Sequence, residues 1–209
     1  IDRLKQNIIK LAGIILVIAA VSGIASCGKS TASTEKVFYY GDTTFNAEND
    51  ETDVNPHNGY SGWACIRYGV GETLFKYSDT MELEPCLAES YENVDELTWK
   101  INLKDGITFT SGRKLDGEAV KECIEHLVAV HKRAAGDLNI ERVEAEADTV
   151  IITTAKPVPA LINYLSDPYG CIIDMQAGIS DDGIVIGTGP YVATELVTDD
   201  HVNLVKNEN

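Results

Sequence analysis

Histidine and cysteine have the most versatile chemistry among the side chains of this sequence, which contains four histidines and five cysteines. Neutral imidazole and thiolate groups ligate transition metals. The histidines are spread along the chain, at His57, His126, His131 and His201. Cys123 and His126 fall on one predicted helix, of which only one face can be buried. We therefore expect structural or solvated histidines, no metal held by the protein alone, and no cofactor.

The cysteines support neither a redox motif nor a zinc ribbon, because no two of them form a Cys-x-x-Cys pair. Besides Cys27, the chain contains Cys65, Cys86, Cys123 and Cys171. In an exported protein these four residues allow three disulfide pairings, which sequence alone does not separate. Buried thiols are the alternative, and we favour it for Cys123.

Two signatures of common enzymes are missing, since the sequence contains neither Gly-x-Ser-x-Gly nor His-Glu-x-x-His. Gly187-Thr188-Gly189 lacks the third glycine and the preceding strand of a dinucleotide site, so it predicts a turn. With 33 acidic residues in the chain, chance carboxylate pairs carry no weight. We expect a protein that is not an enzyme.

Cys27 follows a run of small residues, a short apolar stretch and a positively charged flank. This arrangement resembles a bacterial lipoprotein signal peptide, which is cut before a cysteine that then receives lipid. The apolar stretch, residues 11–21, is too short for a membrane-spanning helix, which needs about 20 residues. We predict a signal peptide over 1–26, lipid attachment at Cys27, a flexible tether over 27–36, and a location on the outer side of the cell membrane.

The chain is strongly acidic, with 17 basic and 33 acidic residues and a net charge of −16. Removal of residues 1–26 leaves 14 basic and 32 acidic residues, a net charge of −18. Such a charge repels nucleic acid, so we expect no nucleic-acid partner. It suits a cationic or zwitterionic ligand, or serves only solubility at a crowded cell surface.

Hydrophobic patterning predicts an α/β chain built of antiparallel hairpins rather than βαβ units. Alternation over 97–103 predicts a strand, and the Asp105-Gly106 turn predicts a return strand over 107–109. Asp116 is predicted to cap a helix over 117–134. Other predicted elements are a strand at 37–40, a loop at 43–62, a helical segment at 66–77, a hairpin at 143–154, a short helix at 157–165 and a hairpin at 191–205.

Several motifs follow one another in a distinctive order. They are Asp53-Val54-Asn55-Pro56-His57, Tyr68-Gly69-Val70-Gly71-Glu72-Thr73-Leu74, Leu83-Glu84-Pro85-Cys86-Leu87-Ala88-Glu89-Ser90, the stretch from Thr98 to Phe109, Gly187-Thr188-Gly189-Pro190-Tyr191, and Val202-Asn203-Leu204-Val205-Lys206-Asn207. This series resembles the N-terminal part of family 5 extracellular solute-binding proteins, the dipeptide, oligopeptide and nickel receptors of ABC importers. The resemblance covers nearly all of 37–209.

The resemblance implies a type II (cluster C) periplasmic-binding-protein-like fold with mixed sheets, of which this chain holds the first lobe only. Two lobes of such receptors close on a solute, and the membrane permease recognises the closed form. Residues 37–70 and 186–209 are expected to form parts of the lobe I core, and 71–185 a peripheral subdomain. The second lobe is expected beyond Asn209.

The resemblance also implies which residues line the ligand pocket, namely Tyr60, Gly62, Trp63, Ala64, Asp167 and Tyr169. Two of them have alternative roles. Trp63 stacks on a ligand or anchors the core. Asp167 pairs with a ligand amine or caps the turn before Pro168.

The kind of solute stays open between a peptide and a metal chelate. Nickel and metallophore receptors of the family tend to carry an arginine on the second pocket loop, and residues 166–170 contain none. Residues 55–57 and 206–209, in contrast, look closer to the nickel branch. The alternative function is a surface sensor or adhesion protein on the same fold, coupled to signalling rather than transport.

Overall fold

The computed structural model describes residues 36–42 and 53–208 of the chain. The predicted signal peptide, Cys27 and the tether up to residue 35 lie outside these residues. Residues 36–41 belong to a separate part of the chain and contain no helix or strand, so the strand predicted at 37–40 is wrong. Within the described ranges, no helix is long and apolar enough to cross a membrane.

The largest sheet has four antiparallel strands in the order β4 (Ala88–Asn93), β5 (Thr98–Leu103), β7 (Thr149–Thr154) and β6 (Ile140–Glu146). Alternation along β5 buries Trp99, Ile101 and Leu103, as the sequence pattern predicts. The second predicted hairpin is confirmed as β6 and β7, which turn at Ala147 with a φ of 52°. This sheet supplies one wall of the hydrophobic core.

The return strand predicted at 107–109 is wrong. Strand β5 pairs with β4 on one edge and with β7 on the other, so neither edge is free for residues 107–109. These residues run in a loop that forms one isolated bridge, Thr108 with Lys114, and Phe109 is fully buried in the core.

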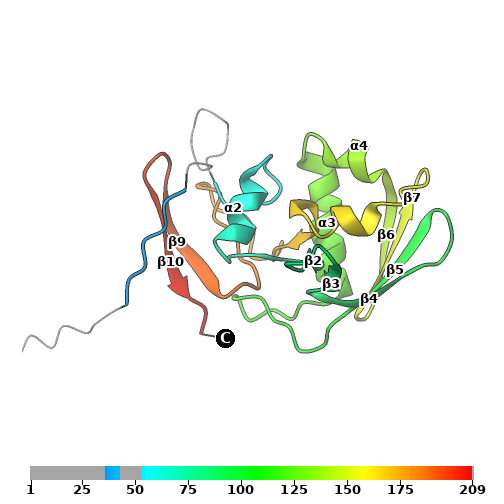
Figure 1. The fold of residues 1–209 in the computed structure, drawn as a ribbon, viewed down its shortest axis with the longest axis horizontal. Coiled ribbons are helices and arrows are strands. Elements are labelled where there is room, and N and C mark those ends of the chain that lie inside the picture. The colour runs from blue at the N-terminus through cyan, green and yellow to red at the C-terminus, as the bar shows by residue number, and fades with distance from the viewer. Residues whose placement is uncertain (1–35, 43–52, 209) are drawn as a thin grey trace, which may run out of the picture. The chain divides into compact units, whose positions relative to one another are not determined.

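Helix α3 (Gly117–Val130) packs on β6 and β7 (Figure 1). The Asp116 carboxylate accepts a hydrogen bond from the Ala119 amide at 3.0 Å, which confirms the predicted cap. The helix ends at Val130 rather than at residue 134. The Nδ1 atom of His131 accepts hydrogen bonds from the Arg133 and Ala134 amides, each at 3.2 Å, and a separate helix α4 (Ala134–Leu138) follows.

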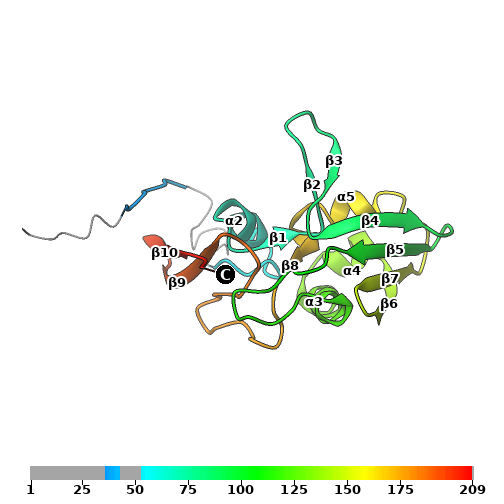
Figure 2. The same cartoon turned by 90° about the horizontal axis from the view of Figure 1, so that it is seen from below.

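The helical segment predicted at 66–77 is also wrong. Helix α2 (Ser61–Arg67) lies earlier and ends just before Gly69, which has a φ of +68° that favours glycine. Short strands follow it: β1 (Glu72–Thr73) pairs with β8 (Cys171–Ile172), and β2 (Phe75–Tyr77) pairs with β3 (Leu83–Pro85). Figure 2 shows the β2–β3 hairpin standing away from the other elements.

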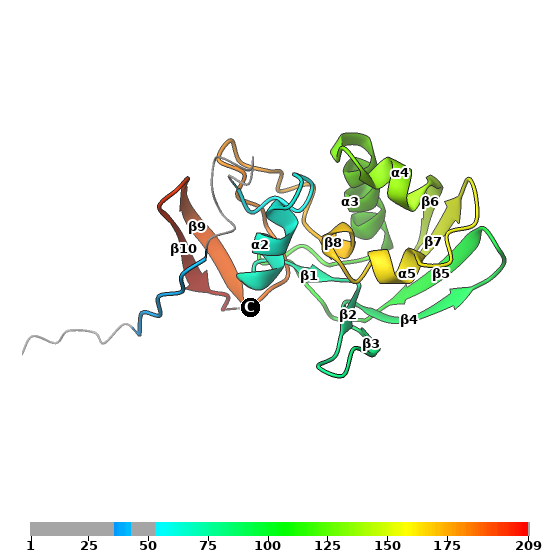
Figure 3. The same ribbon diagram turned by 45° about the horizontal axis from the view of Figure 1, so that its top comes forward.

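The C-terminal half contains a short helix α5 (Leu161–Tyr164), a 3-10 turn η2 (Pro168–Gly170), and the predicted last hairpin, β9 (Tyr191–Val197) with β10 (His201–Lys206). The predicted helix at 157–165 is therefore shorter than expected. Figure 3 shows α2 and β1 between the β9–β10 hairpin and the four-stranded sheet.

The Gly187-Thr188-Gly189 segment is a packing junction between two backbone stretches. The Gly189 amide donates to the Val70 carbonyl at 3.1 Å, and the Tyr191 amide donates to the Gly69 carbonyl at 3.0 Å. A Cβ atom on Gly187 would lie 2.1 Å from the Val70 oxygen, so the close approach requires glycine. This junction holds the segment that leads to β9 against the turn after α2.

Candidate functional site

A cavity of about 390 Å³ lies between the loop before α2, the turn from α3 to α4, and the segment of α5 and η2. Its lining residues are His57, Asn58, Gly59, Tyr60, Trp63, Val130, His131, Lys132, Arg133, Asp137, Tyr164, Asp167, Pro168 and Tyr169. The walls come from three separate stretches of the chain, 57–63, 130–137 and 164–169, so the cavity exists only in the folded chain.

Four of the six residues expected at the pocket line this cavity: Tyr60, Trp63, Asp167 and Tyr169. The Trp63 side chain is 41% exposed, so it is not a core anchor. Gly62 and Ala64 are buried in α2 and are not among the lining residues. A Cβ atom on Gly62 would lie 2.5 Å from Cβ of Pro168, so this glycine allows α2 to pack against η2.

Asp167 occupies the position before η2, but its side chain makes no capping hydrogen bond there. The turn is closed by backbone, with the Gly170 amide donating to the Asp167 carbonyl at 2.8 Å. Partial burial raises the pKa of the Asp167 carboxyl above its ordinary value. The alternative prediction, that the Asp167 side chain caps the turn before Pro168, is therefore wrong.

Sequence reasoning missed the two cationic side chains that line the cavity, Lys132 and Arg133. The Arg133 guanidinium carbon lies 5.9 Å from the centre of the Tyr60 ring, and its Nε lies 3.8 Å from Asp137. The Tyr169 hydroxyl donates to the same Asp137 carboxylate at 2.7 Å. Residues 166–170 contain no arginine, but the fold brings Arg133 into the cavity from the turn after α3.

The histidines are less scattered than their spacing suggests. His57 is only 4% exposed, and its Nδ1 lies 2.7 Å from Nδ1 of His126, so one ring donates and the other accepts. Its Nε2 lies 3.4 Å from Sγ of Cys123. Burial lowers the pKa of His57 to about 3, helped by the nearby charges of His126 and His131. Across 36–42 and 53–208, no three His, Cys, Asp or Glu side chains are arranged to hold a metal ion.

We expect the buried His57 to make the protein sensitive to acid. In the unfolded chain this group takes up a proton near pH 6.5, but in the folded chain only near pH 3. Between these two pH values only the unfolded chain binds the proton, which favours unfolding. The stability that neutral His57 contributes is therefore complete above pH 6.5, and it is lost as the pH falls toward 3, at up to about 1.4 kcal/mol per pH unit.

Urea unfolding of the complete protein at pH 7, 5 and 4 measures this effect. The His57→Gln variant should lose less stability than the wild type over this range. His201→Gln is the control, because His201 is exposed and neighbouring carboxylates raise its pKa. Equal pH dependence of the wild type and His57→Gln would contradict the assignment.

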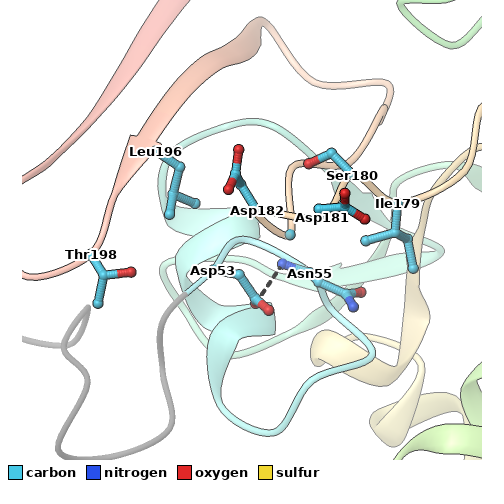
Figure 4. Close-up of a pocket in the computed structure, with 9 residues that line it drawn as sticks. Asp53, Asn55, Ile179, Ser180, Asp181, Asp182, Leu196 and Thr198 are labelled. Atoms are coloured by element: carbon cyan, nitrogen blue, oxygen red, sulfur yellow. Dashed lines mark hydrogen bonds between the residues drawn. The ribbon is translucent and has the colours of Figure 1, made fainter.

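The Asp53-Val54-Asn55-Pro56-His57 motif shapes the loop that enters the cavity. Side-chain oxygens of Asp53 and Asn55 accept hydrogen bonds from the amides two residues ahead, at 3.0 Å and 2.9 Å. Figure 4 shows Asp53 and Asn55 beside Asp181 and Asp182, at a second hollow of about 310 Å³. The motif thus has a structural role, since it positions His57.

Residues 23–30 also match the letters Gly-x-x-x-x-Gly-Lys-Ser of a phosphate-binding loop. They overlap the lipoprotein-like cleavage segment and lie outside the described residues. A phosphate-binding loop belongs to a strand–loop–helix unit of a βαβ fold, whereas all paired strands described here are antiparallel. The match therefore carries no functional assignment.

The fold resembles that of solved nickel-binding and nickel-transporter proteins. It superposes on NikA from Staphylococcus aureus, solved in complex with Ni(L-His)2, with a TM-score of 0.69 and 28% identity, covering 75% of this chain and 33% of that one. A nickel ABC transporter structure from Bacillus halodurans matches with a TM-score of 0.69 and 30% identity over the same shares. The mixed α/β structure is thus part of a type II periplasmic-binding-protein-like fold, as the resemblance implies.

Residues 82–209 match the family model for bacterial extracellular solute-binding proteins, family 5 Middle, and the chain belongs to this family. The nickel-binding protein NikA of S. aureus is 32% identical over 126 residues, covering 60% of this chain and 26% of the relative. The glutathione-binding protein GsiB of Escherichia coli K12 is 30% identical over 196 residues, covering 88% and 38%. The chain thus spans between a quarter and two fifths of the length of these relatives, which are binding proteins rather than enzymes.

Proposed function

We propose that this chain is part of a lipid-anchored, extracytoplasmic solute receptor that delivers its ligand to the permease of an ABC importer. The observation that carries the proposal is the cavity in which Tyr60, Trp63, Asp167 and Tyr169 meet Arg133. Family membership supports the same function, since the family consists of extracellular solute-binding proteins.

The solute that suits this cavity carries carboxylates and an amine. Arg133 and Lys132 provide positive charge for a carboxylate, Asp167 provides negative charge for an amine, and Trp63 provides an aromatic face. Amino-acid chelates of a metal such as nickel have these groups, and so do short peptides. The names of the relatives, a nickel-binding and a glutathione-binding protein, cover both classes.

We further propose that residues 37–70 and 186–209 belong to the core of the first lobe and 71–185 to its peripheral subdomain. The hydrogen bonds that join Gly189 to Val70 and Tyr191 to Gly69 support the first pairing. A second lobe, contributed by the rest of the protein, would close over the cavity. Cys27 would carry the lipid, and the tether over 27–36 would let the receptor reach the permease.

We expect Trp63→Ala to weaken solute binding by about 10- to 100-fold, because it removes the largest aromatic face of the cavity. Isothermal titration of the complete protein with its identified solute measures the change. Trp63→Phe should retain part of the affinity. Tyr91→Leu is the control, since this residue lies on β4 outside the cavity lining. Unchanged affinity of Trp63→Ala would remove Trp63 from the site.

Native mass spectrometry of the complete mature protein, purified gently from its own host, tests the function. A bound mass with a nickel isotope pattern would support the metal-chelate class, and a bound peptide mass would support the peptide class. If no ligand is retained and neither nickel–histidine nor a peptide mixture raises the melting temperature, the transport proposal fails in favour of a surface sensor.

A further inference from the structure

Two buried cysteines meet between α2 and β8. Cys65 lies in α2 and Cys171 begins β8, they are 106 positions apart in sequence, and both side chains are at most 1% exposed. Their Sγ atoms are 3.8 Å apart. Of the three pairings that the sequence leaves open, only one contains a link between Cys65 and Cys171.

The other cysteines have different surroundings. Sγ of Cys123 lies 3.4 Å from His57 Nε2 and accepts a hydrogen bond from the Ile173 amide at 3.4 Å. Cys86 is half-buried at the start of the segment between β3 and β4. Cys86 therefore serves as an internal control for the Cys65 and Cys171 pair, whereas Cys123, whose Sγ lies 3.7 Å from the Cys171 carbonyl oxygen, is the competing partner that the test must exclude.

The space around the two sulfurs is shaped by Gly71. A Cβ atom at this position would lie 2.5 Å from Sγ of Cys171 and 2.9 Å from Sγ of Cys65. Any side chain on residue 71 would push one or both sulfurs aside. The glycine therefore leaves room for the two sulfurs to meet.

We propose that Cys65 and Cys171 form a disulfide in the mature protein, and that this bond ties α2 to β8. A disulfide has an S–S bond of about 2.05 Å, so the sulfurs must approach by less than 2 Å from their present contact. An extracytoplasmic compartment of the kind proposed above permits the bond. The inference depends on that location but not on the identity of the solute.

The bond would form by thiol–disulfide exchange with the disulfide of an oxidoreductase or of a small-molecule oxidant. Each cysteine thiol loses its proton, the two sulfurs together give up two electrons, and the oxidant leaves as a pair of thiols. Burial puts both sulfurs out of reach of an oxidant in the folded state, and the contact with Cys65, together with burial, raises the pKa of the Cys171 thiol well above its ordinary value. Oxidation therefore occurs during folding, before α2 and β8 close over the sulfurs.

The crosslink has a consequence for the cavity. Helix α2 carries Trp63, and η2, which leads directly into Cys171, carries Tyr169. A bond from Cys65 to Cys171 limits how far these two walls can separate. It also closes a long loop, which restricts the unfolded chain and stabilises the folded one.

The test is to refold the complete mature protein from its reduced, denatured state in a buffer of oxidised and reduced glutathione. Free thiols are then blocked with N-ethylmaleimide, and the protein is digested without reduction for mass spectrometry. We expect a linked peptide pair that contains Cys65 and Cys171, with Cys86 and Cys123 blocked. Blocked Cys65 and Cys171, or a link to any other cysteine, would overturn the proposal.

Matched variants separate the bond from general folding defects. Oxidised wild-type protein should melt several degrees higher than reduced protein. This difference should vanish in Cys65→Ala/Cys171→Ala and persist in Cys86→Ala. Gly71→Ala should lower the yield of the link, and Gly136→Ala should not, because a Cβ atom there meets nothing within 4 Å. If the double variant kept the wild-type difference in melting temperature between oxidised and reduced protein, the proposal would also be overturned. Neither the melting temperature nor the yield of the link involves a solute or a permease, so these tests are independent of the transport function.

Discussion

Arg113→Ala should lower the free energy of unfolding by about 3–5 kcal/mol, the loss typical of breaking a buried ion pair. The Arg113 guanidinium donates to Asp174 at 2.9 Å and to Glu122 at 2.8 Å. The Asp174 side chain is only 3% exposed, and it also accepts a hydrogen bond from the Ser111 hydroxyl at 2.7 Å. Although burial opposes its ionisation, these donors hold the pKa of Asp174 below its ordinary value, so the variant would leave a buried charge without its cation.

Urea unfolding at pH 7 measures this loss, and the neighbouring Lys114 is the matched control. Lys114 pairs with Asp148 at 2.9 Å but is 48% exposed, so Lys114→Ala should cost far less stability than Arg113→Ala. The double variant Arg113→Met/Asp174→Leu should be more stable than Arg113→Ala, because it removes both charges. Similar losses for Arg113→Ala and Lys114→Ala would show that burial of the pair does not matter.

Gly189→Ala should destabilise the protein by about 3 kcal/mol or more, because backbone atoms cannot move aside as a flexible side chain can. A Cβ atom on this residue would lie 2.2 Å from the Gly69 carbonyl oxygen and 2.8 Å from that of Val70. The hydrogen bond from the Gly189 amide to Val70 would be lost as the segments separate. The β9–β10 hairpin would then lose its attachment to the turn after α2.

Thermal unfolding of the complete protein measures the effect, and Gly136→Ala provides the opposite case. Gly136 lies in α4 with open space around its Cα, so alanine there should raise stability by up to about 1 kcal/mol through helix propensity. If Gly189→Ala melted as the wild type does, the junction at residues 187–189 would not contribute to stability as inferred.

Elements with a strong local signal were predicted correctly. Strand β5 follows from alternation of Trp99, Ile101 and Leu103 with polar residues, and helix α3 begins at the Asp116 cap. Both signals act over a few neighbouring residues, so they depend little on the rest of the fold. The helix predicted at 66–77 failed because Gly69 and Gly71 outweigh the apolar spacing around them.

The amino-acid sequence by itself determined the family, through the order of its motifs, and four residues that line the cavity, including Trp63 and Tyr169. Only the tertiary structure decided that Arg133 enters that cavity, that His57 meets His126, and that Cys65 contacts Cys171. These contacts join residues that are tens of positions apart. They arise when the α2, α3 and β8 segments bury their apolar faces together, and no local pattern records which side chains then become neighbours.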